Sequence, residues 1–185
     1  MTTSSELSHV RWPEIRDEAA AILPPRRGRD ARPLPPLAEM LKMKGNPANG
    51  AKLFSAPETG CANCHRVKEQ GVDFGPNLTE IGSKLGKDAL YQSILEPSAG
   101  ISFGFEAWQI QLQSGDEAYG LIVSETAEEL AVKAVGGIVT RYKKSEISKR
   151  EQMKLSIMPV DLQQAMSTQD LVDLVEYLSS LKKLP

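Results

Sequence analysis

Hydrophobic residues recur at helical spacing in three parts of the chain. The first part runs from Pro47 to just before Cys61, and an asparagine ahead of the proline can cap it. The second part is residues 87–96, which are followed by a proline that cannot continue a helix. The third part follows Ser167, and Asp170 three residues later completes an approximate capping box. We therefore predict three helices, of which the last has the clearest apolar stripe.

The spacing changes between the second and third predicted helices. Residues 105–150 contain short runs that are rich in β-branched and aromatic residues, and these runs are separated by SGD, ETAEE and VGG. Such turn-like breaks are typical of hairpins. We predict a small antiparallel β insertion, over residues 103–150, within an otherwise helical protein.

The N-terminal part of the chain differs in composition from the rest. Residues 13–23 have the spacing of a short helix, and the sequence PPRRGRDARPLPP that follows predicts an extended, solvated connector. We assign residues 1–44 to an appendage, residues 45–102 to the first part of a helical core and residues 151–185 to its second part. The β insertion separates the two parts of this core.

Composition and charge narrow the classes of partner. The chain has 185 residues, of which 41% are apolar, and this is enough to bury one or two modest cores. The formal net charge of −2 and the lack of a long basic patch argue against a nucleic acid partner. No apolar run approaches the roughly 20 residues of a membrane-spanning helix, and the first residues lack the layout of a signal peptide. We expect a folded chain without a transmembrane segment.

The sequence CANCH at residues 61–65 is the strongest chemical signal. Cys61 and Cys64 are the only cysteines, so neither a disulfide framework nor a four-thiolate zinc site is available. A zinc site with fewer thiolates lacks a ligand, because the only other histidine, His9, lies far away in the appendage. A thioredoxin-like redox pair would follow a strand in a βαβ unit, and the sequence predicts none. The motif therefore predicts one covalent haem c, with the thiols on its vinyl groups and His65 on its iron.

The second axial ligand of the haem iron has to come from another part of the chain. A methionine thioether is common in electron carriers and favours ferrous iron. Met158 lies in the sequence SIMP ahead of the last helix, where Pro159 stiffens the loop, and Met153 is its nearest competitor. The remaining candidates suit gap-filling in a core, and they are Met40, Met43 and Met166. We predict ligation by Met158.

Several short sequences, in this order, resemble those of a class I cytochrome c, namely NGAKLF, CANCH, GPNL, SIMP and LVDLVEYLSSL. More narrowly, residues 44–183 resemble the haem-binding domain at the C-terminus of large exported proteins of planctomycetes and verrucomicrobia, which often follows a propeller-like dehydrogenase domain. That domain also has a stretch similar to ILEPSAGIS and a β insertion ahead of the methionine. The resemblance implies a mainly α cytochrome c fold around one covalent haem, with a small antiparallel β subdomain inserted into it.

The resemblance also implies roles for individual residues. His65 and Met158 become the axial pair, and Pro76 lies against His65 with a nearby backbone carbonyl that accepts the imidazole N–H. We expect apolar side chains to line the haem cavity and to disfavour the extra charge of ferric haem. These residues are Phe74, Leu78, Ile81, Tyr91, Ile94 and Leu95.

Packing is the expected role of other aromatic residues. By the same resemblance, Gly50 and Phe54 meet Tyr177 where the first and last helices of the core cross. Trp108 either touches the haem or packs under the β insertion, and both readings stay open.

These observations favour an electron-transfer domain that is not itself an enzyme, with a redox protein or a fused dehydrogenase domain as its partner. One alternative is a haem-based gas sensor or peroxidase-like enzyme with a labile distal methionine, and another is a binding module with a structural haem. Edge strands of the β insertion are a candidate surface for a partner or for a homodimer. Because haem attachment takes place outside the cytoplasm, we expect a periplasmic or otherwise exported protein from which this chain is an excised domain.

Overall fold

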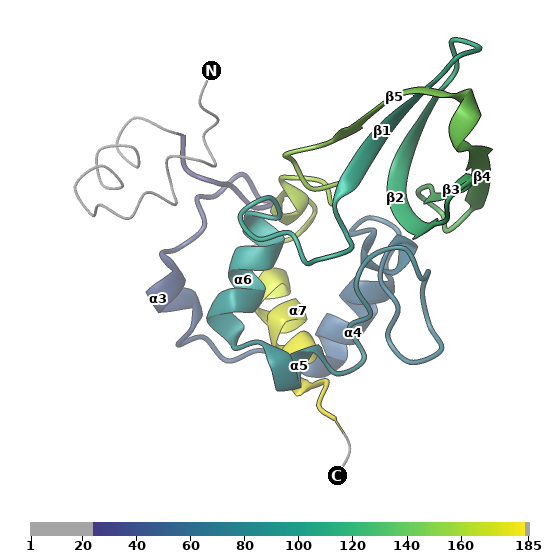
Figure 1. Ribbon diagram of the computed structural model, residues 1–185. Coiled ribbons are helices and arrows are strands. Elements are labelled where there is room, and N and C mark those ends of the chain that lie inside the picture. The colour runs from purple at the N-terminus through teal and green to yellow at the C-terminus, as the bar shows by residue number, and fades with distance from the viewer. Residues whose placement is uncertain (1–23, 184–185) are drawn as a thin grey trace.

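The computed structural model describes residues 24–183 (Figure 1). The helix expected over residues 13–23 lies outside the described residues. The helices within the described range are α3 (Leu37–Met40), α4 (Pro47–Ser55), α5 (Ile81–Lys84), α6 (Lys87–Leu95) and α7 (Thr168–Ser180), with the short 3₁₀ turns η1 (Cys61–Asn63), η2 (Lys144–Glu146) and η3 (Leu162–Ala165). The strands are β1 (Ala107–Leu112), β2 (Glu117–Glu125), β3 (Glu129–Lys133), β4 (Val139–Lys143) and β5 (Ile147–Gln152). None of the described helices is long and apolar enough to cross a membrane.

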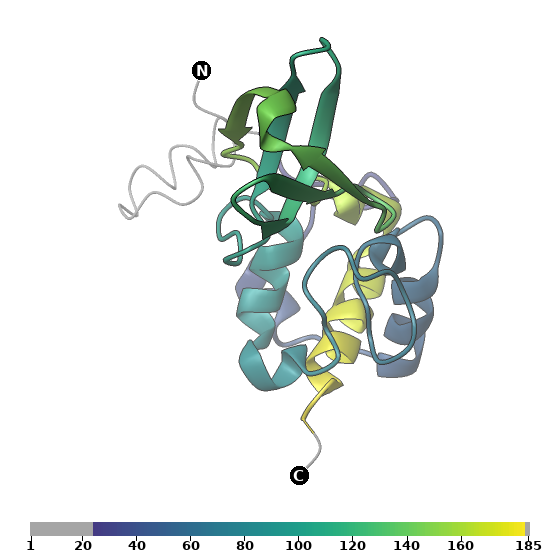
Figure 2. The ribbon, with the colours of Figure 1, turned by 45° about the vertical axis from the view of Figure 1, so that its right-hand side comes forward.

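Helix α7 is the centre of the helical part, and α4, α5 and α6 all pack against it. In Figure 2 the yellow α7 lies between the teal α6 and the blue α4. The three helices predicted from the spacing are present, and Ser167 and Asp170 form the predicted capping box. Each leucine or valine buried on the apolar stripe of α7 stabilises the fold by about 1.5–3 kcal/mol. This stripe consists of Leu171, Val172, Leu174, Val175 and Leu178.

Helices α4 and α7 cross at Gly50. A Cβ atom at this position would collide with the carbonyl of Asp173 and with the side chain of Tyr177, so the close crossing requires a glycine. On the same side of α4, the rings of Phe54 and Tyr177 meet with their centroids 5.9 Å apart. The predicted contact of Gly50 and Phe54 with Tyr177 is therefore confirmed.

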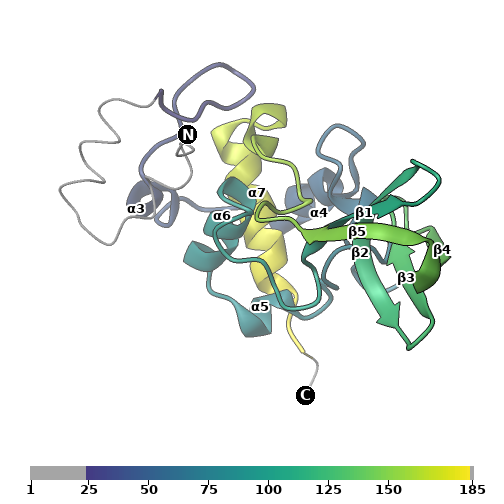
Figure 3. The ribbon, with the colours of Figure 1, turned by 45° about the horizontal axis from the view of Figure 1, so that its top comes forward.

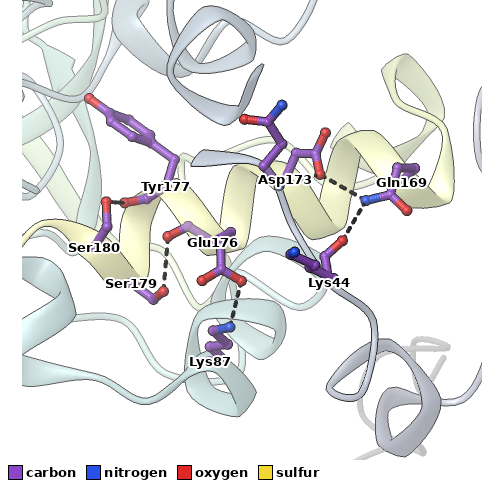
Figure 4. A network of polar contacts seen from close by, with 9 residues as sticks. Lys44, Lys87, Gln169, Asp173, Glu176, Tyr177, Ser179 and Ser180 are labelled. Atoms are coloured by element: carbon purple, nitrogen blue, oxygen red, sulfur yellow. Dashed lines mark hydrogen bonds and ion pairs between the residues drawn. The ribbon is translucent and has the colours of Figure 1, made fainter. Parts of the chain in front are cut away.

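A buried carboxylate on α7 fixes the start of α4, and Figure 4 shows this carboxylate, Asp173, with Gln169 and Lys44 beside it. Asp173 is 4% exposed, and it accepts hydrogen bonds from the backbone N–H of Asn46 and from the side chains of Asn49 and Gln169, each at 2.8 Å. Gln169 also donates to the carbonyl of Lys44 at 3.1 Å. Because three donors face the carboxylate, its burial is compensated. The network holds the chain that leads into α4 against α7.

The proline-rich segment before α3 contacts the helical part. Arg26 forms an ion pair with Glu96 at 2.9 Å, and Arg29 forms one with Asp170 at 3.1 Å. Most of residues 24–36 are exposed, as expected of a solvated connector. The segment is not extended, however, because Arg27 and Pro33 form an antiparallel bridge, and Arg26 and Arg29 tie it to the ends of α6 and α7.

The β insertion forms one antiparallel sheet with the strand order β4-β3-β2-β1-β5. The first four strands follow one another as a meander, and β5 then returns to pair with β1. Figure 3 shows the sheet beside the helices rather than among them. The sheet has a small apolar core of its own, formed by Ile110, Leu130 and Val132 with Trp108, Leu112, Ala118, Ile122, Tyr142 and Ile147 packed around them.

The prediction of a mainly α fold is wrong. The described residues contain 31% helix and only somewhat less strand, 22%, and the strands form a five-stranded antiparallel sheet. Two of the helices, α3 and α5, have only four residues each, whereas the sheet builds a second apolar core. The chain therefore has a helical part and a β part, and each part has an apolar core of its own.

Candidate haem site

The residues of CANCH form a tight turn shortly after α4. Gly60 has a φ of 68°, a left-handed conformation that favours glycine, and η1 begins at the next residue. The backbone N–H groups of Cys64 and His65 both donate to the carbonyl of Cys61, at 3.2 and 2.9 Å. One turn of chain therefore presents both thiols and the imidazole.

Both thiols of the motif are free and half-buried. Burial raises the pKa of Cys61, although a hydrogen bond with Thr59 opposes the shift, and burial also raises the pKa of Cys64. The thiols are therefore protonated at neutral pH, unlike the low-pKa thiol of a disulfide oxidoreductase. This environment suits thiols that become covalently attached to a cofactor rather than thiols that cycle between redox states.

One hydrogen bond orients the imidazole of His65. Its Nδ1 lies 2.8 Å from the carbonyl oxygen of Pro76, and because that oxygen only accepts, Nδ1 carries the proton. Burial lowers the pKa of His65, while the bond to Pro76 opposes the shift, so the ring is neutral at neutral pH. This tautomer leaves the Nε2 lone pair free to bind a metal.

Residues 71–76 wrap around the motif. A Cβ atom at Gly75 would lie 2.8 Å from Cε1 and 3.0 Å from Nδ1 of His65, so a glycine lets the chain pass close to this ring. The backbone N–H groups of Phe74 and Gly75 donate to the carbonyl of Cys64 at 3.1 and 2.6 Å. The role of Gly75 was not predicted from the sequence, although its place in GPNL, shortly after the motif, is a signal for it.

The predicted lining residues divide into three groups. Tyr91 and Ile94 on α6 are buried in the helical core, whereas Phe74 is buried outside that cluster. Half-buried side chains pack against the helical core as well, and among them are Cys61, Leu78, Ile81 and Leu95. One thiol of the motif therefore borders an apolar surface of the kind that a haem needs.

Met158 lies in a loop between β5 and η3. Its backbone N–H donates to Oγ of Ser156 at 3.1 Å, and the N–H of Ser156 donates to Oγ of Ser98 at 3.1 Å. The N–H of Met153 instead donates to the carbonyl of Ala107 at the start of β1, at 2.8 Å. Both methionine side chains are half-buried. The described hydrogen bonds of this loop lead to Ser98 and not to the CANCH motif.

The remaining methionines and Trp108 have packing roles. Met40 and Met166 are buried in the helical core and Met43 packs against it, as gap-filling predicts. Trp108 packs against the core of the sheet, and the guanidinium of Arg150 lies 5.6 Å from its ring centroid. Of the two readings for Trp108, the structure favours packing under the β insertion.

A comparison with known protein families gives one match. Residues 47–121 match the family model described as Cytochrome c, and this range contains α4, the CANCH motif, α5 and α6. The match covers less than half of the chain, and it supports a cytochrome c domain with a haem-binding, electron-transfer function. It ends inside β2 and does not extend to Met158. No curated protein matches the chain.

The described residues fit a haem of this kind. The thiols of Cys61 and Cys64 are free and protonated, Nε2 of His65 is free, and Gly75 leaves room for the ring. Cys61 packs against the apolar cluster of the helical core. Covalent attachment and axial ligation need these features together.

Proposed function

We propose that this chain is a mono-haem electron-transfer domain. Cys61 and Cys64 would attach one haem c, and Nε2 of His65 and the thioether of Met158 would hold its iron. The observation that carries the proposal is the hydrogen bond from Nδ1 of His65 to the carbonyl of Pro76, which orients the ring and leaves Nε2 free. The match to the Cytochrome c family supports the same function.

The surrounding residues determine how this site works. When bound, the haem supplies an iron that gains and loses one electron. The bond to Pro76 holds His65 in place and raises the basicity of the imidazole. The thioether of Met158 favours ferrous iron, and the apolar side chains beside Cys61 keep water away and disfavour the additional charge of the ferric state.

The choice of Met158 over Met153 rests on their places in the chain. Met153 follows β5 directly and is bonded to the start of β1, so it belongs to the sheet. Met158 lies five residues further along, in a loop that is tied to Ser98 near the end of α6. Met40 and Met166 pack inside the helical core and Met43 packs against it, so we assign these three methionines to packing.

The proposal extends to the organisation of the chain and its surroundings. Residues 45–102 and 151–185 hold the haem, residues 103–150 form the sheet beside it, and residues 1–44 precede the site. A redox protein, or a dehydrogenase domain fused to this one, exchanges electrons with the haem. Because c-type haem is attached outside the cytoplasm, the domain functions in the periplasm or another exported location.

Replacement of Met158 tests the ligand assignment. We expect Met158→Ala to keep the covalent haem, because both cysteines remain, but to lose the thioether-to-ferric-iron absorption band entirely. Ferric iron should become high spin, the reduction potential should fall and CO should bind readily. Met153→Ala is the matched control and should retain the wild-type spectrum and potential.

Two results would redirect the proposal. If Met153→Ala lost the band and Met158→Ala kept it, the two methionines would exchange roles. If the wild-type protein itself bound CO rapidly, a haem-based sensor or peroxidase-like enzyme with a labile methionine would replace the electron carrier.

A further inference from the structure

The end of strand β3 reaches the segment that wraps around the CANCH motif. Lys133, the last residue of β3, donates from Nζ to the backbone carbonyl of Asp73 at 2.8 Å and pairs with its carboxylate at 3.1 Å. The side chain of Lys133 is 18% exposed, whereas that of Asp73 is 67% exposed. The lysine is therefore enclosed between the sheet and this segment, while the carboxylate stays largely in water.

A second contact joins the same two parts of the molecule. Gly137, in the turn between β3 and β4, has a φ of 82°, and a Cβ atom there would lie 3.2 Å from Cγ1 of Val72. The backbone N–H of Val72 donates to the carbonyl of Ala62, inside the CANCH motif, at 2.9 Å. The hairpin of β3 and β4 thus lies against this segment at two neighbouring residues.

A short path leads from Asp73 to the ring of His65. The next residue, Phe74, donates its N–H to the carbonyl of Cys64 at 3.1 Å. Two residues further, the carbonyl of Pro76 accepts the proton on Nδ1 of His65 at 2.8 Å. Only two residues lie between Asp73, which contacts the sheet, and Pro76, whose carbonyl orients the imidazole, so both contacts act on one short segment.

We propose that Lys133 is a positioning residue for His65. By holding the backbone of Asp73 to the sheet, it keeps the carbonyl of Pro76 in place against Nδ1 of the iron ligand. The inference rests on the proposed function, because it treats His65 as that ligand. Through Lys133, the β insertion influences the basicity of the imidazole that binds the haem iron, since the hydrogen bond at Nδ1 sets this basicity. An ion pair to an exposed carboxylate adds little to global stability, so the effect is local.

Exchange of the Nδ1 proton of His65 with solvent measures this positioning directly. NMR of the ferrous holoprotein, prepared as the full chain, compares the wild type with Lys133→Met, which keeps the side-chain length but donates no hydrogen bond. We expect exchange to become about tenfold faster in this variant, as loss of one hydrogen bond of ordinary strength implies. Lys133→Arg retains a charged donor and should restore most of the protection.

Lys149→Met is the matched control. Lys149 also lies in the sheet, on β5, and forms an exposed ion pair with Glu151 at 2.8 Å, away from residues 71–76. Its replacement should leave the exchange rate of the His65 proton at the wild-type value. An equal acceleration in both methionine variants would show a general loosening of the sheet and would overturn the specific role of Lys133.

The remaining outcomes separate this inference from the proposed function. If the wild-type protein carries no haem, or if His65 does not bind its iron, both fail together. If the wild-type holoprotein is normal and Lys133→Met leaves the exchange unchanged, the inference alone fails. If Lys133→Met does not yield folded holoprotein, Lys133→Gln takes its place, because its shorter side chain does not reach the carbonyl of Asp73. An unchanged exchange rate in Lys133→Gln overturns the inference.

Discussion

At the scale of single residues, Gly75 is a strict steric requirement of the haem site. The space beside it is taken by the ring of His65, since a Cβ atom would lie within 2.8 to 3.3 Å of three ring atoms. These distances are shorter than ordinary contacts, and the ring is held in place by its bond to the carbonyl of Pro76. Any side chain at this position therefore has to move either the ring or the backbone.

We expect Gly75→Ala to lower the fraction of protein that carries haem and to destabilise the holoprotein by about 1–3 kcal/mol, as overpacking generally does. The ratio of haem absorbance to protein absorbance and the midpoint of urea unfolding measure the two effects. Gly100→Ala is the control, because a Cβ atom at Gly100 meets no atom within 4 Å. Identical behaviour of the two variants would contradict the steric role of Gly75.

At the scale of elements, the crossing of α4 and α7 depends on a polar network as well as on apolar packing. Where the two helices cross, Asp173 accepts hydrogen bonds from the backbone N–H of Asn46, just before α4, and from the side-chain amides of Asn49 and Gln169. The glycine contact and the ring contact bring the two helices close, and the carboxylate fixes where α4 begins. Because α4 leads into CANCH, this network also sets the place of the motif relative to α7.

Asp173→Ala should destabilise the protein by about 2–4 kcal/mol, because hydrogen bonds to a charged acceptor are lost and buried donors remain unpaired. Urea unfolding, followed by the circular dichroism of the helices, gives the free energy of unfolding. Glu128→Ala removes an exposed carboxylate from the loop before β3 and should change stability by less than about 0.5 kcal/mol. A loss for Asp173→Ala as small as that of the control would show that the network is dispensable.

The elements differ in how far the sequence predicts them. The start of α4 and the capping box of α7 follow from residues that are neighbours in the chain, and both are present. The return of β5 to β1 and the ion pairs of the proline-rich segment join residues that are far apart in the chain. No local pattern specifies such partners, so neither the return of β5 nor the ion pairs of the proline-rich segment could be predicted.

At the scale of the whole molecule, two apolar cores share the chain. The mainly α fold was expected because the haem motif and the resemblance of the sequence motifs to a class I cytochrome c both concern the helices. The sheet nevertheless builds a core of its own and touches residues 71–76 through Lys133 and Gly137. The thiols and the imidazole could be predicted because their spacing is itself the signal. The roles of Asp173 and Lys133 could not, since they depend on contacts between distant segments.

The intact mass of the full chain, measured under denaturing conditions after expression with haem-attachment machinery, tests covalent attachment most directly. We predict a single species that is heavier than the polypeptide by one haem, and it should stain for haem after denaturing electrophoresis. Replacement of both Cys61 and Cys64 by alanine should return the mass to that of the polypeptide, because the proposal places the attachment at these two thiols. An unmodified mass for the wild-type chain, from cells that load haem onto another cytochrome c, would contradict the proposed function.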